Sequence, residues 1–370
     1  MIVKSLELEN FRNHKDTKIS FSDRFNVIFG DNGQGKTNIL EAIYLCASGR
    51  SHRTSKDSEL IRFTCGSYKV SAFVKTSGLE KDICIDYFAD QKKQIKINEI
   101  PLHKIGALMG NLYAVFFSPE DLFIVKQGPT ERRRFVDITL SQIKPAYFYD
   151  LQLLSKVLKQ RNTLLKSLNN HPALIDTVDV WNRKLAEVAA SIITARRIFS
   201  KKLSELAKSQ HKFLTIEKEI ISFDYHCSFQ IGEDTEKSEL IEIYIRQLEK
   251  NISRDIALGY TSAGPHRDDY DISINGKSLK LFGSQGQQRS SVLSLKIAEI
   301  ELIYNETGEY PVLLLDDVMS ELDENRQKYL MDSIKNVQTF ITCTGDAHFR
   351  QTMKGECKYF KVLDGNIADS

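Results

Sequence analysis

Long apolar runs are missing from this sequence. No hydrophobic stretch approaches the ~20 residues that a transmembrane helix needs, which argues against a membrane transporter. The first residues, MIVKSLELENF, alternate like a strand and carry acidic side chains early, unlike a signal peptide. The six cysteines form no C-x-x-C pair, so we expect reduced thiols and neither disulfides nor a zinc site. These absences together favour a cytoplasmic protein.

Motifs for reading a DNA sequence are missing too. The chain shows no helix-turn-helix, no zinc finger and no aromatic motif suited to base stacking. Any contact with nucleic acid is therefore expected to involve backbone and shape, with little preference for base sequence. The chain also lacks a convincing N-K-x-D motif, which would recognise the guanine base of GTP.

A phosphate-binding loop is the clearest motif that is present. Residues 30–37 read GDNGQGKT, a full match to G-x-x-x-x-G-K-[ST], between a strand-like run at 25–29 and a helix-like pattern from Ile39. The glycines let backbone N–H groups turn inward, Lys36 supplies charge for the β- and γ-phosphates, and Thr37 supplies a hydroxyl for Mg²⁺. We therefore predict a site for ATP and Mg²⁺. Its candidate contacts are Gly30, Asp31, Asn32, Gly33, Gln34, Gly35, Lys36, Thr37 and Asn38.

The acidic strand that such a loop requires lies almost at the other end of the chain. Residues 311–323 read PVLLLDDVMSELD, a short apolar run that suits a buried parallel strand and ends in two carboxylates. We predict that Asp316 holds Mg²⁺ with Thr37, and that Asp317 orients or deprotonates the attacking water. With Lys36, these are the candidate catalytic residues. The 280 residues between Lys36 and Asp316 imply a large insertion in the nucleotide-binding fold.

A second anion site is predicted at the start of a long helix. The signature segment, residues 283–289, reads GSQGQQR and precedes an amphipathic pattern that includes Ile297 and Tyr304. Its serine and glycine are placed at a helix N-terminus, where backbone N–H groups bind anions. One chain does not need two such sites for one triphosphate. We therefore expect Ser284, Gly286 and Gln287 to contact the nucleotide of another subunit.

The order of these motifs resembles an ABC-type ATPase head. The opening segment LELENFRNH is similar to the branch of SMC and Rad-fifty-like proteins, and further segments narrow the resemblance to the bacterial RecF recombination-mediator family. These segments run from end to end: GRSHRTSKDSELI, FFSPEDL, GPTERRRFVD, YTSAGPHRDDY and GSQGQQRS. Arg12, Asn13 and Arg53 are added as candidate nucleotide contacts. The resemblance implies an α/β head with mixed sheets around the helix of the phosphate-binding loop.

Two departures from the general ABC pattern are visible. The residue after the Mg²⁺ carboxylate is usually glutamate, and the shorter Asp317 suggests slow hydrolysis. The switch histidine of ABC heads should follow the strand predicted at 339–344, where Thr344 stands and His348 lies a few residues beyond. The sequence leaves the switch role open between these two residues.

The insertion differs in character from the head. Residues 1–115 show strand-like alternation, whereas two stripes at 151–165 and 181–206 have helical spacing and flank the turn signal NNHP. We expect these stripes to form an antiparallel helical hairpin. The predicted head comprises residues 1–115 and 255–370, and the predicted helical lobe comprises residues 116–254.

Charge is segregated along the chain, although the net charge is only +2. Residues 126–166 carry nine Lys/Arg and three Asp/Glu, and residues 183–212 carry eight and two. A basic helical lobe favours contact with duplex phosphates, although clustered arginines can instead brace the lobe against Asp121 or Asp137. The DNA-contact candidates are Arg132, Arg133, Arg134, Lys156, Lys159, Arg196 and Arg197.

These observations predict an ATP-dependent homodimer that clamps duplex DNA and opens on slow hydrolysis. The resemblance implies a role in recombinational repair and replication at gapped DNA or junctions, with partners of the RecR and RecO families. The alternative is a dimeric scaffold that binds ATP without turnover. A P-loop kinase or GTPase is disfavoured by the signature segment.

Overall fold

The computed structural model describes residues 1–168, 171–345, 350 and 357–369. The chain forms two compact units, one of Met1–Leu122 with Arg289–Ser370 and one of Phe123–Gln288. The insertion is longer than the sequence predicted, because residues 255–288 belong to it and not to the head. The physical reason is strand pairing, since β10 (Asp269–Ile274) pairs with β9 (Ile221–His226) inside the insertion.

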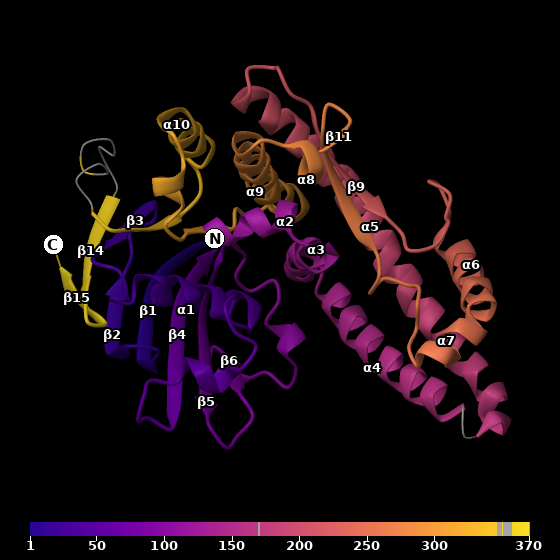
Figure 1. Ribbon diagram of the computed structural model, residues 1–370. Coiled ribbons are helices and arrows are strands. Elements are labelled where there is room, and N and C mark those ends of the chain that lie inside the picture. Colours follow the sequence, from indigo (N-terminus) through magenta and orange to yellow (C-terminus); the bar gives the residue numbers. More distant parts are fainter. Residues whose placement is uncertain (169–170, 346–349, 351–356, 370) are drawn as a thin grey trace. The chain divides into compact units, whose positions relative to one another are not determined.

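The first unit contains two sheets and the helix of the phosphate-binding loop (Figure 1). One sheet is antiparallel, in the order β2-β1-β4-β5-β6-β7, and the other is mostly parallel, in the order β15-β14-β3-β13-β12-β8. Helix α1 (Lys36–Ser48) contacts strands of both sheets and shares one apolar core with them. The α/β head with mixed sheets around this helix is therefore confirmed.

The bounds of the strands in this unit follow the chain. They are β1 (Ile2–Phe11), β2 (His14–Ser20), β3 (Phe25–Phe29), β4 (Ser67–Thr76), β5 (Leu79–Phe88), β6 (Gln94–Ile97), β7 (Ile100–Pro101), β8 (Ala114–Phe117), β12 (Val312–Leu315), β13 (Thr339–Cys343), β14 (Cys357–Leu363) and β15 (Asn366–Asp369). The helical elements besides α1 are η1 (Asp57–Leu60), η2 (Ile105–Ala107), η3 (Pro119–Leu122), α9 (Gln285–Thr307, which begins in the second unit), η5 (Val318–Glu321) and α10 (Glu324–Ser333).

Hydrophobic patterning explains which sheet each strand joins. β4 buries alternate residues, as a strand with one covered face does, whereas β12 is apolar and buried at every position. β12 pairs in parallel with β13, and β13 pairs in parallel with β3. The carboxyl ends of β3 and β12 therefore meet at one edge of the sheet, which brings the phosphate-binding loop to the acidic pair.

Helix α9 differs from the amphipathic helix that the sequence predicted. Residues 291–300 are all buried, and Tyr304 of the predicted apolar stripe is 40% exposed. Lys296, in this buried stretch, forms ion pairs with Glu299 and with Asp121. Asp121 thus stabilises the buried charge of α9.

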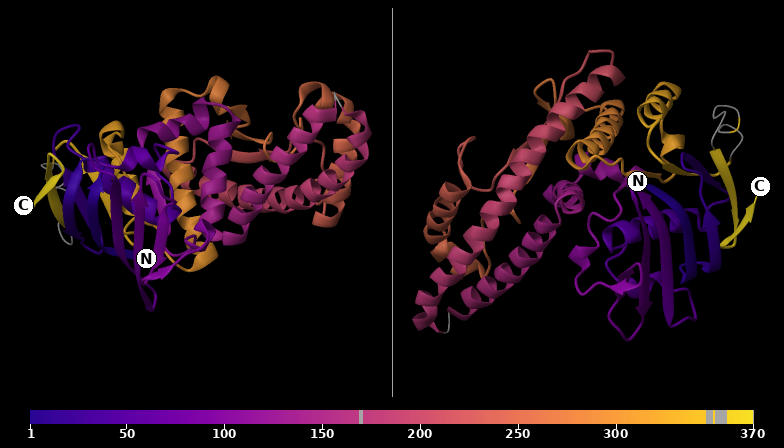
Figure 2. Two further views of the ribbon diagram at one scale, coloured as in Figure 1. Left: turned by 90° about the horizontal axis from the view of Figure 1, so that it is seen from below. Right: turned by 180° about the vertical axis from the view of Figure 1, so that it is seen from behind.

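The second unit is a helical hairpin with a small sheet (Figure 2). α4 (Pro145–Leu168) and α5 (Val178–Leu214) pack along each other, as their apolar stripes predict, while residues 169–170 of the turn lie outside the described ones. An antiparallel sheet in the order β11-β10-β9 packs on α5. The other elements are α2 (Phe123–Lys126), α3 (Pro129–Ile143), η4 (Pro172–Thr177), α6 (Lys237–Lys250), α7 (Ile252–Leu258), β11 (Lys277–Ser278) and α8 (Leu279–Phe282).

The described residues hold neither a bilayer-spanning helix nor a metal cluster made by the protein alone. Their helices lack the combination of length and apolar character that crossing a membrane needs. Within the same residues, no group of three or more His, Cys, Asp or Glu side chains could hold a metal ion. All six cysteines are free thiols.

A buried ion pair ties the helices of the second unit together. Arg161 of α4 and Asp255 of α7 are fully buried, with Nη1 and Oδ2 2.8 Å apart. Arg161 also donates to Asn182 of α5 and to the Thr261 hydroxyl, each at 2.8 Å. One guanidinium thus links three helices, so that losing its counter-charge leaves a buried cation.

We expect Asp255→Asn to destabilise the second unit by about 3–5 kcal/mol, the usual result of breaking a buried ion pair. The exposed change Glu249→Gln on α6 is the matched control and should have little effect. Urea denaturation followed by helical circular dichroism measures both variants. Equal stability of the two would show that Arg161 does not depend on this carboxylate.

Candidate functional site

The phosphate-binding loop joins β3 to α1 and contains glycines in left-handed backbone. Gly30 has a φ of +148°, and a Cβ built there would lie 2.5 Å from a carbonyl oxygen of β14. Gly35 has a φ of +112°, and a Cβ there would lie 2.5 Å from the Asn13 amide oxygen. Inside the loop, Lys36 Nζ donates to the Gly30 carbonyl at 2.6 Å. At Gly30 and Gly35 the backbone therefore combines a positive φ with close neighbours, which disfavours any residue that has a Cβ.

Asp316 is hydrogen-bonded directly to the phosphate-binding loop. Thr37 Oγ1 donates to Asp316 Oδ1 at 2.8 Å. Thr342 of β13 donates to the same oxygen at 2.8 Å, and its hydroxyl accepts the backbone N–H of Asp317 at 2.9 Å. Burial raises the pKa of Asp316, the two threonine hydroxyls oppose that shift, and the charge of Asp317 adds to it. A hydroxyl and a carboxylate thus stand together as oxygen donors, the kind that Mg²⁺ prefers.

Asp317 has a strained backbone. Its φ of 53° lies in the left-handed region, which few residues other than glycine adopt. Such strain costs on the order of 1–3 kcal/mol and clusters at functional sites. The Asp317 N–H is held by Thr342, and its carbonyl accepts the Ser320 hydroxyl at 2.8 Å. The backbone that carries this carboxylate is therefore fixed on both sides.

The segment after β1 braces the phosphate-binding loop. Asn13 Nδ2 donates to the Gln34 carbonyl at 2.7 Å, and Asn13 Oδ1 accepts from Asn38 Nδ2 at 2.8 Å. His14 Nε2 lies 3.2 Å from the Gly35 carbonyl, and burial lowers the pKa of this imidazole. Asn13 and Asn38, both predicted nucleotide contacts, are thus held at the loop by each other.

Arg12 forms a two-point ion pair with a buried carboxylate of α1. Its Nε and Nη2 lie 2.9 and 2.8 Å from the two oxygens of Glu41, and its Nη1 donates to the Glu59 carbonyl. Burial alone would raise the pKa of Glu41, but hydrogen bonds from Arg12 and Ser51 lower it below the usual value. Arg12 therefore uses three of its five N–H donors on the protein, and its predicted contact with nucleotide rests on the other two.

The other predicted contacts lie around this loop. Asp31, Asn32 and Gly33 are exposed at its tip. Arg53 Nη1 lies 3.5 Å from the Asn38 amide oxygen. Burial raises the pKa of Asp316, and the charge of Arg53 offsets a small part of that rise. The structure thus brings Arg53 to the side of the site that holds the carboxylates.

The two candidates for the switch role differ in what can be said of them. Thr344 follows β13 directly and is exposed. His348 lies outside the described residues. Thr344 therefore lies at the carboxyl end of β13, and its switch role remains a prediction.

Ser284 and Gln287 form a reciprocal cap at the start of α9. Ser284 Oγ accepts the Gln287 N–H at 3.2 Å, and Gln287 Oε1 accepts the Ser284 N–H at 2.9 Å. This is the capping-box arrangement S-x-x-Q. The exposed Ser284 hydroxyl can still donate its own proton, and Gly286 lies in the first turn of the helix. The predicted second anion site is therefore a capped helix N-terminus.

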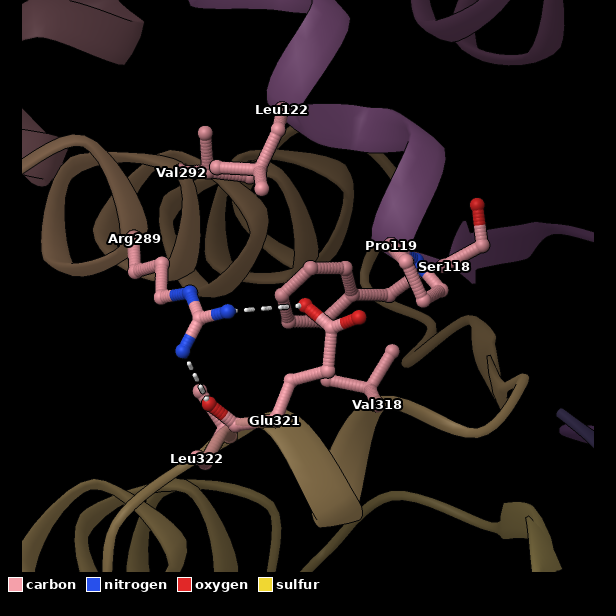
Figure 3. A pocket seen from close by; sticks show the side chains of 9 residues that line it. Ser118, Pro119, Leu122, Arg289, Val292, Val318, Glu321 and Leu322 are labelled. Carbon is pink, nitrogen blue, oxygen red and sulfur yellow. Dashed lines mark hydrogen bonds and ion pairs between the residues drawn. The ribbon is translucent and has the colours of Figure 1, made fainter. Parts of the chain in front are cut away.

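In the first unit, α9 is also attached to the segment after the acidic pair (Figure 3). Arg289 Nη1 donates to the Glu321 carbonyl at 3.0 Å, and its Nη2 lies 3.5 Å from the Glu321 carboxylate. A cavity of about 20 Å³ beside this contact is lined in part by Val292, Val318 and Leu322. That volume admits a water molecule and excludes a nucleotide. The cavity therefore belongs to packing around η5.

Two of the DNA-contact candidates are buried, which corrects the prediction for them. Arg132 is 6% exposed and pairs with Asp269 at 2.7 Å. Arg196 is 2% exposed, lies 2.9 Å from Asp137 and donates to the Pro265 carbonyl at 2.6 Å. Neither guanidinium is free to meet a phosphate. The bracing alternative, which concerned the cluster Arg132–Arg134, holds for Arg132, with Asp269 as its partner in place of Asp121 or Asp137. Asp137 pairs instead with Arg196, a contact that the sequence did not predict.

The remaining candidates divide by exposure. Arg133 donates to the Asp268 carbonyl at 2.6 Å, and Arg197 donates to the Thr235 carbonyl at 3.0 Å. Arg134, Lys156 and Lys159 are exposed on α3 and α4. Arg134 also lies 3.9 Å from the Glu131 carboxylate, so Lys156 and Lys159 are the stronger candidates for contact with phosphates.

Sequence reasoning missed three polar side chains of the nucleotide site. Thr342 contacts Asp316, Glu41 contacts Arg12 and His14 contacts the Gly35 carbonyl. None of the three was named as a site residue, although His14 ends the quoted segment LELENFRNH. A threonine inside the apolar strand TFITC was the available signal for Thr342. Glu41 and His14 carried no such signal, because their partners come from distant segments.

Comparisons with known proteins agree with this geometry. The family described as RecF/RecN/SMC N terminal domain matches residues 2–365. "DNA replication and repair protein RecF" of Ruminiclostridium cellulolyticum is 70% identical over 368 residues, which is 99% of each chain. The protein of the same description from Acetivibrio thermocellus is 54% identical over 367 residues, again 99% of each.

Solved structures give the same answer. A structure described as the recombination mediator protein RecF with ATP is similar with a TM-score of 0.93 and 39% identity, covering 100% of this chain and 97% of the other. A Smc head domain from Pyrococcus furiosus has a TM-score of 0.55 at 16% identity, covering 100% and 96%, which shows the shared fold alone. The full-length match, the high identity and the position of every motif have one explanation: this chain belongs to the RecF family.

Proposed function

We propose that this chain is an ATP-dependent DNA-binding protein of recombinational repair and replication. The observation that carries the proposal is the bond between Thr37 and Asp316, which unites the phosphate-binding loop with the acidic strand. The proposal is supported by the similarity to a RecF structure described with ATP. The chain would act in the cytoplasm on nucleoid DNA, and its relatives' description as replication and repair proteins supports that role.

The roles of the loop and the acidic pair follow from their chemistry. Lys36 would bind the β- and γ-phosphates as a point charge. Thr37 and Asp316 would hold Mg²⁺, which neutralises phosphate charge when it is bound. Asp317 would orient the attacking water, and its short side chain suits slow hydrolysis.

The signature segment would complete the nucleotide site of a second copy. Its helix N-terminus, with the exposed Ser284 hydroxyl and the Gly286 backbone, is suited to the γ-phosphate. ATP would then lie between two subunits and hold a dimer closed. Hydrolysis would remove the γ-phosphate that joins them and let the dimer open.

The closed dimer would clamp duplex DNA near gaps or junctions. Arg134, Lys156 and Lys159 are the exposed basic side chains of the candidate set, and the helical unit that carries them is the proposed DNA-facing part. Partners of the RecR and RecO families are proposed because related structures are described within the RecFOR pathway. Recombinase loading would be promoted through them.

The second candidate function is a scaffold in which ATP closes the dimer without turnover. The aspartate at position 317 favours it, because a glutamate reaches one methylene further toward a water. Phosphate release with and without duplex DNA separates the two functions. Turnover above the rate of a Lys36→Ala control supports the ATPase, and no turnover supports the scaffold.

Lys36→Ala should weaken ATP binding roughly ten- to hundredfold, because a charge-assisted contact is worth about 1.5–3 kcal/mol. Asp317→Asn should keep ATP affinity and lose hydrolysis. Calorimetric titration and a phosphate-release assay measure the two effects. Normal turnover by Asp317→Asn would remove this carboxylate from its proposed role.

Ser284→Arg should bind ATP normally but remain monomeric. The substitution removes the serine hydroxyl that would contact the γ-phosphate of the other subunit, and the longer arginine side chain does not fit that close contact. Sedimentation with ATP, with ADP and without nucleotide measures the mass of both proteins. A dimer that forms without ATP, or one that this substitution leaves intact, would contradict the shared site.

Lys156→Ala with Lys159→Ala should weaken binding to all duplex sequences alike and leave thermal stability unchanged, because both side chains are exposed. Arg196→Ala should instead lower stability first, since it leaves Asp137 without its partner. Fluorescence anisotropy and thermal melts give the two readouts. Unchanged affinity of the lysine variant would place the DNA surface elsewhere.

The salt dependence of DNA binding should be steeper with ATP than with ADP. Closure would bring two basic helical units to one duplex, and the affinity falls with a slope of about −0.9 per neutralised phosphate. Titrations at several salt concentrations measure this slope. Equal slopes in the two nucleotide states would contradict the clamp.

A further inference from the structure

A carboxylate of the second unit, that of Glu219, contacts Gln287 of the signature segment. Glu219 lies just before β9, and its Oε1 accepts from Gln287 Nε2 at 2.8 Å. Its Oε2 lies 3.1 Å from His211 Nε2. His211 is fully buried in the last turn of α5, a helix of 37 residues. Gln287 is therefore connected through Glu219 to a rigid element of the same unit.

This contact determines which way the Gln287 amide faces. A carboxylate accepts hydrogen bonds and does not donate them, so the NH₂ group of Gln287 must point toward Glu219. The amide oxygen then points toward the Ser284 N–H, where it completes the reciprocal cap. With the amide rotated by half a turn, both bonds would be lost. The capping box thus depends on a residue that is 68 positions away in the chain.

A carboxylate at the position of Glu219 needs a specific explanation. A carboxylate close to an anion site opposes anion binding by charge repulsion. The Glu219 side chain is 21% exposed and bonded on both oxygens, so it is held where it stands. The orientation that Glu219 gives to the Gln287 amide is the benefit that offsets its repulsion of a bound anion.

We infer that Glu219 is a positioning residue for the signature segment: it orients Gln287, which in turn holds Ser284 in place for the γ-phosphate of a partner subunit. The inference rests on the proposed function, since it requires Ser284 to act on a nucleotide bound by another copy. In this proposal Glu219 acts through Gln287 and not on the nucleotide itself.

The test compares Glu219→Ala with Glu219→Gln and with Glu205→Ala, an exposed glutamate of α5. Glu219→Ala should raise the dissociation constant of the ATP-bound dimer roughly tenfold, the effect of one charge-assisted hydrogen bond. Glu219→Gln keeps a carbonyl oxygen for Gln287 and should restore most of the affinity. Glu205→Ala should match the unmodified protein. ATP affinity of the monomer and the melting temperature should be the same in all four proteins.

A double-substitution cycle then identifies the path. If Glu219 acts through Gln287, then Glu219→Ala added to Gln287→Ala should weaken the dimer no further. Additive losses, or an intact dimer in Glu219→Ala, would overturn the inference. A purely structural role for Glu219 would also overturn the inference. It would show as a lower melting temperature of Glu219→Ala together with an equal loss of dimer in Glu219→Gln.

Ser284→Arg, measured beside these variants, separates the inference from the proposed function. A monomeric Ser284→Arg with a fully dimeric Glu219→Ala would leave the shared site standing and remove only the positioning role. A dimeric Ser284→Arg would remove both.

Discussion

The bond between Thr37 and Asp316 is the constraint on which the rest of the structure depends. It joins two residues 279 positions apart, and it exists only because β3, β13 and β12 lie side by side in parallel. Thr342 of the middle strand bonds to the same carboxylate and holds the next residue by its backbone. A site assembled in this way requires the whole head to fold, whatever is inserted between the two strands.

Buried ion pairs fix the arrangement of elements within the insertion. Arg161 with Asp255, Arg132 with Asp269 and Arg196 with Asp137 place guanidinium groups inside the second unit. Such pairs add little net stability compared with apolar packing, but each is costly to break. They fix the geometry of a unit whose small sheet and long helices come from segments far apart in the chain. Much of the basic charge that the sequence displays is therefore used internally.

How much the sequence could predict depends on the range of the interactions involved. Local patterns were sufficient for β3, α1 and β12, and for placing Thr37 of the phosphate-binding loop beside Asp316, because each pattern has a fixed spacing and a known chemistry. The boundary at Gln288 could not be predicted, since it depends on the pairing of β10 with β9. The burial of Arg196 could not be predicted either, because charge counting does not show which cations face acids. The orientation of Gln287 by Glu219 likewise depends on tertiary contacts alone.

The central claim is that one subunit supplies the phosphate-binding loop and another supplies the signature segment. It is tested most directly by mixing two inactive variants, Lys36→Ala and Ser284→Arg, and measuring mass in solution with ATP. Each variant alone should stay monomeric, whereas the mixture should form a dimer with one complete site, from the loop of the Ser284→Arg chain and the signature segment of the Lys36→Ala chain. A mixture that stays monomeric, while the unmodified protein dimerises under the same conditions, would contradict the shared site.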